Sequence, residues 1–169
     1  MDIGKYVDET VSSWHEQRPD IDFKPMGHML LFHAIAEATL AKIQTITKAH
    51  GLTVGEFDVL ATLRRHGTDS TLTPSYIAEV AMVSPSGLTH RLTQLEQAGH
   101  ITRSADNTDR RSSLVLITAS GAAVAEQIVE LIAKHSKRLY EAIPSKHLEQ
   151  FSKVIAQLSE NLESELLVS

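Results

Sequence analysis

Cysteine is absent from the chain of 169 residues. Its absence excludes disulfides, thiolate nucleophiles, Fe–S clusters and cysteine zinc sites. No apolar run approaches the roughly 20 residues that a membrane-spanning helix needs, and the first residues show no basic segment leading into an apolar stretch, as a signal peptide would. Glycine (8) and proline (5) are too scarce for a low-complexity chain. We therefore expect a soluble, cytoplasmic protein with one ordinary packed core.

An excess of positive charge is also missing. The net charge is -5, with six acids against three bases in 1–26, five against two in 141–169, and ten against eleven in 27–140. The acidity therefore lies at the two ends. Any binding to nucleic acid must depend on a few well-placed contacts rather than on bulk charge.

Enzyme and metal signatures are lacking as well. The chain has no G-x-S-x-G, no Gly-rich phosphate loop and no HExxH motif, and the paired carboxylates of Asp20 and Asp22 lie in a connector. The nine histidines include no His-x3-His pair and no carboxylate-rich cluster on one helix face. We expect no enzyme, no catalytic residue, no cofactor and no metal site, although non-adjacent histidines could converge across a dimer.

Hydrophobic periodicity and capping signals predict a mainly helical chain. Thr53 with Glu56 forms a capping-box pattern, and Thr73 and Ser84 each precede a proline at a first helical position. The expected helices are 4–16, 26–49, 53–66, 74–81, 84–98 and 118–143, with a last one capped by Ser145; residues 17–25 read as a connector.

Two apolar seams lie outside the central part of the chain, from Met29 to Thr47 and from Leu148 to Leu162. A small three-helix unit offers them few partners, and exposed seams of that size are interfaces. We expect a homodimer, which would place two recognition helices about 34 Å apart. The alternative is an intramolecular pairing of these helices.

The centre of the chain reads helix, short helix, turn, helix and hairpin, which is the order of a winged helix-turn-helix. The helix 84–98 would be about 22 Å long, a length that suits a major groove. Leu88, Leu92 and Leu95 face inward in this prediction. An arginine at the tip of the hairpin can enter a narrow minor groove. The predicted DNA-binding residues are Ser84, Ser86, Gly87, Thr89, His90, Arg91, Asp109, Arg110 and Arg111. The alternatives are a plain helical hairpin, or a helical interaction module that does not bind DNA.

These segments resemble the MarR family of transcriptional regulators. The resemblance rests on 51–60, 77–79, 83–92, 95–99 and the pattern D-x-R-x-x-x-V-x-[LI]-T-x-x-G that begins at Asp109. It implies a dimer with interlocked terminal helices that binds a palindrome, usually as a repressor relieved by a small ligand. It also implies that Asp109 positions Arg111 in the minor groove. Met82 departs from the pattern, because many helix-turn-helix motifs have glycine at the turn.

A narrower resemblance at the N-terminus, from Trp14 to Met26, is to the urate-responsive HucR/PecS-type branch. That branch implies a ligand site at Trp14, Asp58, Arg91 and Arg103. An anionic purine held by Trp14 and Arg103 would repel Asp58, and a shift of Asp58 could drag the helix of Arg91 off DNA. Trp14 could instead fill an interface, Arg91 could only touch phosphate, and Asp58 could simply pair with Arg103. A phenolic or aromatic carboxylate and a metal remain alternative effectors.

The fold class expected from these observations is mainly α, an α+β winged helix-turn-helix with a two-stranded β-wing and long N- and C-terminal dimerisation helices. We expect three parts: N-terminal helices in 1–50, a DNA-binding domain in 51–118 and C-terminal dimerisation helices in 119–169.

Overall fold

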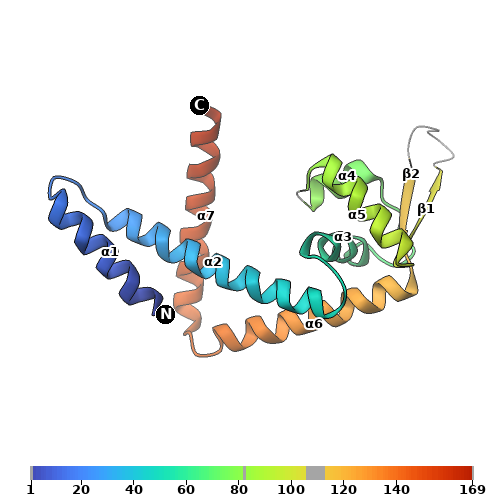
Figure 1. The fold of residues 1–169 in the computed structure, drawn as a ribbon, viewed down its shortest axis with the longest axis horizontal. Helices are drawn as coiled ribbons and strands as arrows, with labels where there is room; N and C mark the ends of the chain where they lie inside the picture. Colours follow the sequence, from blue (N-terminus) through green and yellow to red (C-terminus); the bar gives the residue numbers. More distant parts are fainter. Residues whose placement is uncertain (1, 82, 106–112, 169) are drawn as a thin grey trace. The chain divides into compact units, whose positions relative to one another are not determined.

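A computed structural model describes the backbone of residues 2–81, 83–105 and 113–168 (Figure 1). Met82 and the hairpin segment 106–112, on which the expectations for Asp109, Arg110 and Arg111 fall, lie outside the described residues. The elements are α1 (Ile3–Gln17), α2 (Lys24–Ala49), α3 (Val54–Arg65), α4 (Pro74–Val80), α5 (Pro85–Gln97), β1 (Ile101–Ala105), β2 (Ser113–Ile117), α6 (Ala119–Tyr140) and α7 (Ser145–Val168). The predicted winged helix-turn-helix order is confirmed.

Capping side chains fix most helix starts. Thr53 accepts a hydrogen bond from the Glu56 amide at 3.2 Å, and the Glu56 carboxylate accepts one from the Thr53 amide at 2.8 Å, which confirms the capping box. Thr73 and Ser84 cap α4 and α5 as predicted. Two boundaries were wrong. Helix α6 ends at Tyr140 rather than near 143, and Ser145 is the first residue of α7 rather than its cap, because the Pro144 carbonyl already accepts from the amides of the first turn.

The hydrophobic core lies between α3, α4, α5 and the hairpin. Its fully buried side chains are Leu60, Leu63, Ile77, Leu88, Leu92, Leu95, Ile101 and Val115, each at most 2% exposed. Leu88, Leu92 and Leu95 therefore face inward, as their three- and four-residue spacing predicts. The opposite face of α5 is left to solvent.

The wing is an antiparallel pair in which Ile101 opposes Ile117 and Ala105 opposes Ser113. A third segment joins it. Leu72, just before α4, exchanges two backbone hydrogen bonds with Val115, at 3.0 and 2.9 Å. This bridge attaches the hairpin to the start of the helix-turn-helix.

The chain forms two compact units, Met1–Val129 and Glu130–Ser169. In the first unit, α1 packs along the N-terminal part of α2 (Figure 1). The α2 seam is buried at Thr47, but Met29, Phe32 and Leu40 are each about half exposed. The apolar spacing along α6 predicts that Leu131 and Leu139 face inward, but in the single chain they are 42% and 52% exposed. The α7 seam is also exposed at Phe151, Leu158 and Leu162.

In the described part of the chain, none of the helices has the length and apolar character needed to cross a bilayer.

Candidate nucleic-acid interface and effector site

The outward face of α5 is short-chained and polar. Ser84, Ser86, Thr89 and His90 are exposed on its first two turns. The first amides of a helix are free of intrahelical partners and suit an anion such as phosphate. The Ser84 hydroxyl already accepts from the Gly87 amide at 3.3 Å, so this side chain acts in the structure as the helix cap. These short side chains leave room for a duplex to approach this face of α5.

An ion pair joins α5 to the wing. Arg103 on β1 donates from Nε to Glu96 Oε2 at 2.8 Å, and its Nη2 donates to the same oxygen. Because Arg103 stabilises the charged carboxylate, the pKa of Glu96 lies below its usual value. The sequence reading considered Asp58 as a partner of Arg103, and the structure pairs Arg103 with Glu96 instead.

The base of the wing is held by the T-x-x-G part of the sequence motif. The Thr118 hydroxyl donates to the Gly99 carbonyl at 2.7 Å and accepts from the Gly121 amide at 3.1 Å, so it caps α6 and ties it to the turn after α5. Gly121 is buried against the His100 backbone. The Thr118 amide also donates to the His100 carbonyl at 3.0 Å. The recognition helix, the hairpin and α6 are thus connected through Gly99, His100, Thr118 and Gly121.

Arg91 does not project from the polar face of α5. Its guanidinium lies against the first turn of α3, where a Cβ placed on Gly55 would be only 2.3 Å from Nε. Asp58, one turn further along α3, is half buried, and burial raises the pKa of its carboxyl, an effect that the charge of Arg91 partly offsets. The structure therefore brings together Asp58 and Arg91 from the predicted ligand set.

An open groove of about 930 Å³ lies beside this arginine. It runs between the end of α2, the α2–α3 turn and the start of α5, and its polar lining includes Gln44, Lys48, His90 and Arg91. Lys48 and Arg91 bring two positive charges to this groove, which suit an anionic ligand or a phosphate, and the Glu56 carboxylate also lines it.

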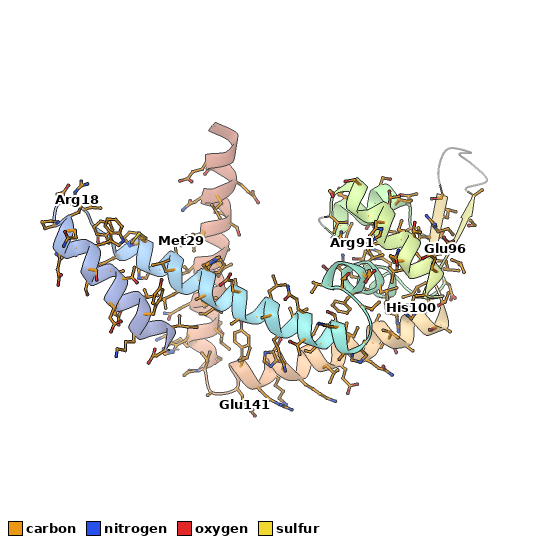
Figure 2. All side chains as sticks on the ribbon, viewed as in Figure 1. Arg18, Met29, Arg91, Glu96, His100 and Glu141 are labelled. Carbon is orange, nitrogen blue, oxygen red and sulfur yellow. The ribbon has the colours of Figure 1, made fainter. Side chains whose placement is uncertain are left out.

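Trp14 is at the other end of α2. Its ring stacks on Phe23, the cap of α2, with ring centroids 5.8 Å apart, and it is 50% exposed. At 1.5 Å per residue, the 26 residues of α2 separate this stack from the groove by about 39 Å. Figure 2 shows Arg18, four residues after Trp14, at the N-terminal end of α2, and Arg91 beyond its C-terminal end. Within one protomer, Trp14 therefore cannot join Asp58 and Arg91 around one ligand.

Sequence reasoning missed Glu96, Gly55 and the Leu72 bridge. A signal existed for Glu96, because a glycine turn between it and Arg103 folds the last turn of α5 back beside β1. Gly55 and Leu72 carried no such signal, because their importance comes from residues far away in the sequence.

A helix-turn-helix with an exposed polar second helix, followed by a paired wing, defines a DNA-binding protein of the transcriptional regulator class. A profile of the MarR family matches residues 52–113. The HTH-type transcriptional regulator PecS of Dickeya dadantii is 37% identical over 127 residues, which are 73% of this chain and 75% of that protein. The chain belongs to the MarR family of transcriptional regulators, and it is not an enzyme.

Solved structures have the same fold. AbsC, a MarR family regulator from Streptomyces coelicolor, superposes with a TM-score of 0.75 at 19% identity, over 85% of this chain and 97% of that one. NadR in complex with 4-hydroxyphenylacetate gives a TM-score of 0.61 at 24% identity, over 75% and 88% of the two chains. At these identities the likeness shows the fold.

Proposed function

We propose that this protein is a cytoplasmic homodimeric repressor that binds a palindromic operator and leaves it when a small effector binds. The observation that carries the proposal is the exposed polar face of α5 beside a hairpin tied to the same helix by Glu96 and Arg103. A helical interaction module without DNA would have no use for this hairpin. Residues 51–118 form the DNA-binding domain in this proposal, and 1–50 and 119–169 supply the dimer.

The exposed α2 seam supports the dimer. Met29, Phe32 and Leu40 present about half of their surface to solvent in one chain, and pairing with a second copy would remove apolar surface worth roughly 25 cal/mol per Å². A two-fold axis would space the recognition helices by about 34 Å, one turn of duplex. The measurement is sedimentation equilibrium, and a monomer at micromolar concentration would contradict the proposal.

The DNA contacts divide between two grooves. Ser84, Ser86, Gly87, Thr89 and His90 face the major groove from α5. The wing residues Asp109, Arg110 and Arg111 lie outside the described residues, and their assignment rests on the family pattern. Arg111 enters the minor groove and Asp109 orients it in this proposal.

Arg111→Ala tests the interface. Operator binding is measured by gel shift on DNA flanking the gene at several salt concentrations. Loss of one arginine from the minor groove should weaken specific binding by about 1–3 kcal/mol and reduce the salt slope by about one. Arg138→Ala, which removes the same charge from the end of α6, is the matched control. Equal binding by Arg111→Ala and wild-type protein would exclude the wing assignment.

The effector is a flat anion, with urate or a related purine favoured by the similarity to PecS and the N-terminal segment. Asp58, Arg91 and Arg103 stand on α3, α5 and β1 of one protomer, and the partner's Trp14 would supply the stacking surface. An anion that drew Arg103 from Glu96 and repelled Asp58 would shift α5 through Arg91. An aromatic carboxylate, the ligand type in the NadR structure, is the alternative. No described histidine or carboxylate belongs to a cluster of three that could hold a metal, so a metal effector has no support here.

Titration of the operator complex with urate, xanthine and 4-hydroxyphenylacetate separates the effectors. Release by urate, lost in both Trp14→Ala and Arg103→Ala, is the expected result. Release by 4-hydroxyphenylacetate alone would assign the carboxylate class, and urate release unchanged in Trp14→Ala would remove Trp14 from the site.

A further inference from the structure

Gly55 lies under the guanidinium of Arg91. A Cβ built on Gly55 would be 2.3 Å from Nε, 2.6 Å from Cζ and 2.8 Å from Nη2 of Arg91. All three separations are well inside van der Waals contact, so the arginine occupies the space that any side chain at position 55 would need. Glycine also costs stability at a helical position compared with alanine. Gly55 is the second residue of α3, so this helix is less stable than it would be with alanine at the same position.

A second glycine lies close to the same guanidinium. A Cβ on Gly87, one turn before Arg91, would be 3.5 Å from Nη1. The Arg91 side chain therefore lies between the first turns of α3 and α5 and is only partly exposed. We call this position of the side chain its seat. Asp58 lies one turn beyond Gly55 on α3, close enough for the charge of Arg91 to act on its carboxyl.

We propose that Gly55 is a positioning residue, which keeps Arg91 seated on α3 in the effector-free protein and so couples α3 to the recognition helix. Its effect on operator binding rests on the proposed function, because it assumes that Arg91 acts from this seat. In this proposal Gly55 acts on operator binding through the position of Arg91 and not through a contact of its own. Any larger residue at position 55 would expel the guanidinium and break the coupling.

A double-mutant cycle tests this positioning role. Wild type, Gly55→Ala, Arg91→Ala and the double variant are compared as full-length proteins, with Gly4→Ala as the control. Gly4 is also the second residue of a helix behind a capping side chain, and a Cβ there would meet only Asp2, at 3.4 Å. Gly4→Ala should therefore raise the melting temperature slightly, by about 1–3 °C, and leave operator binding unchanged.

Thermal unfolding provides the first readout. In the Arg91→Ala background the obstruction is gone, so Gly55→Ala should raise the melting temperature as Gly4→Ala does. In the protein that retains Arg91, Gly55→Ala should lower the melting temperature or leave it unchanged. Only a clash between Arg91 and the side chain at position 55 would make Gly55→Ala change the melting temperature in opposite directions in the two backgrounds. An equal change in both backgrounds would overturn the proposal.

The Asp58 carboxyl and the operator provide the other readouts. Measured by NMR titration, the pKa of Asp58 should rise in Gly55→Ala, as it should in Arg91→Ala. The double variant should show no further rise. Operator affinity without effector should fall by a similar factor in all three variants, about fivefold or more if one charged contact is lost.

The outcomes separate this inference from the proposed function. If Arg91→Ala weakens operator binding and Gly55→Ala does not, Arg91 acts on DNA directly and the positioning role is overturned. If the two losses multiply in the double variant, Gly55 acts by another route and the proposal also fails. If neither variant changes operator binding but the pKa and melting cycle behave as expected, the seat is real and the assumed role of Arg91 in the proposed function is wrong.

Discussion

Gly121→Ala tests how the wing is attached to the rest of the DNA-binding domain. A Cβ on Gly121 would lie 2.1 Å from the His100 carbonyl oxygen, 2.9 Å from its carbon and 3.1 Å from its Cα. These are backbone atoms, so no side-chain rotation relieves the clash. The start of α6 and the strand entry must separate by roughly 1 Å to reach an ordinary contact of about 3.4 Å.

The cost follows from this separation. Overpacking of a tight core costs about 1–3 kcal/mol, and weakening of the adjacent hydrogen bond from the Thr118 amide to the His100 carbonyl adds about 1 kcal/mol. A total of about 3 kcal/mol lowers the melting temperature of a chain of this size by roughly 6–12 °C.

Thermal unfolding followed by circular dichroism at a fixed protomer concentration measures the effect, with Gly4→Ala as the control. Operator affinity below the transition should also fall, because the hairpin is displaced. A melting temperature within 2 °C of wild type would show that the close approach of Gly121 to His100 does not constrain the fold.

Two further predictions concern α3. Because burial raises the folded-state pKa of Asp58, the folded protein holds this proton more tightly than the unfolded chain, and stability from this group falls as pH rises through the folded pKa. Asp58→Asn should therefore be more stable than wild type to urea at pH 7, and the advantage should vanish below the unfolded pKa of about 4; an equal advantage at both pH values would contradict the assignment. Thr53→Ala removes the capping box and should cost about 1 kcal/mol, or roughly 2–4 °C in melting temperature, whereas Thr53→Ser should retain most of it. If Thr53→Ser lowered the stability as much as Thr53→Ala, the hydroxyl would not be the source of the stabilisation.

Local signals in the sequence predicted the fold well. Caps at Thr53, Thr73 and Ser84 act within three residues of themselves, so the helix starts that they mark could be located without a structure. The hairpin was recognisable because its strands are separated by turn residues. The bridge between Leu72 and Val115 was not recognisable, because a single pair of backbone hydrogen bonds leaves no pattern in the side chains.

The candidate effector site could be predicted only in part. The resemblance placed Asp58 and Arg91 in one site, and in the structure the charge of Arg91 acts on the Asp58 carboxyl. The partner of Arg103 was uncertain because two carboxylates, Asp58 and Glu96, were within plausible reach, and only the path of β1 decides between them. Trp14 was grouped with these residues by resemblance, although it lies beside the N-terminal end of α2 and they lie beyond its C-terminal end.

The Leu72 bridge has a consequence for how the protein leaves DNA. The hairpin is anchored at β2 to the segment that starts α4, through Leu72, and at its base to the turn after α5, through Thr118 and Gly99, so in the proposed mode of binding α5 and the hairpin would leave their grooves together. An effector that tilts α5, as proposed above, would then retract the hairpin in the same movement, because these two anchors do not depend on the ion pair between Arg103 and Glu96. Dissociation should then proceed in a single kinetic phase, without a half-detached intermediate in which the minor groove alone is still occupied.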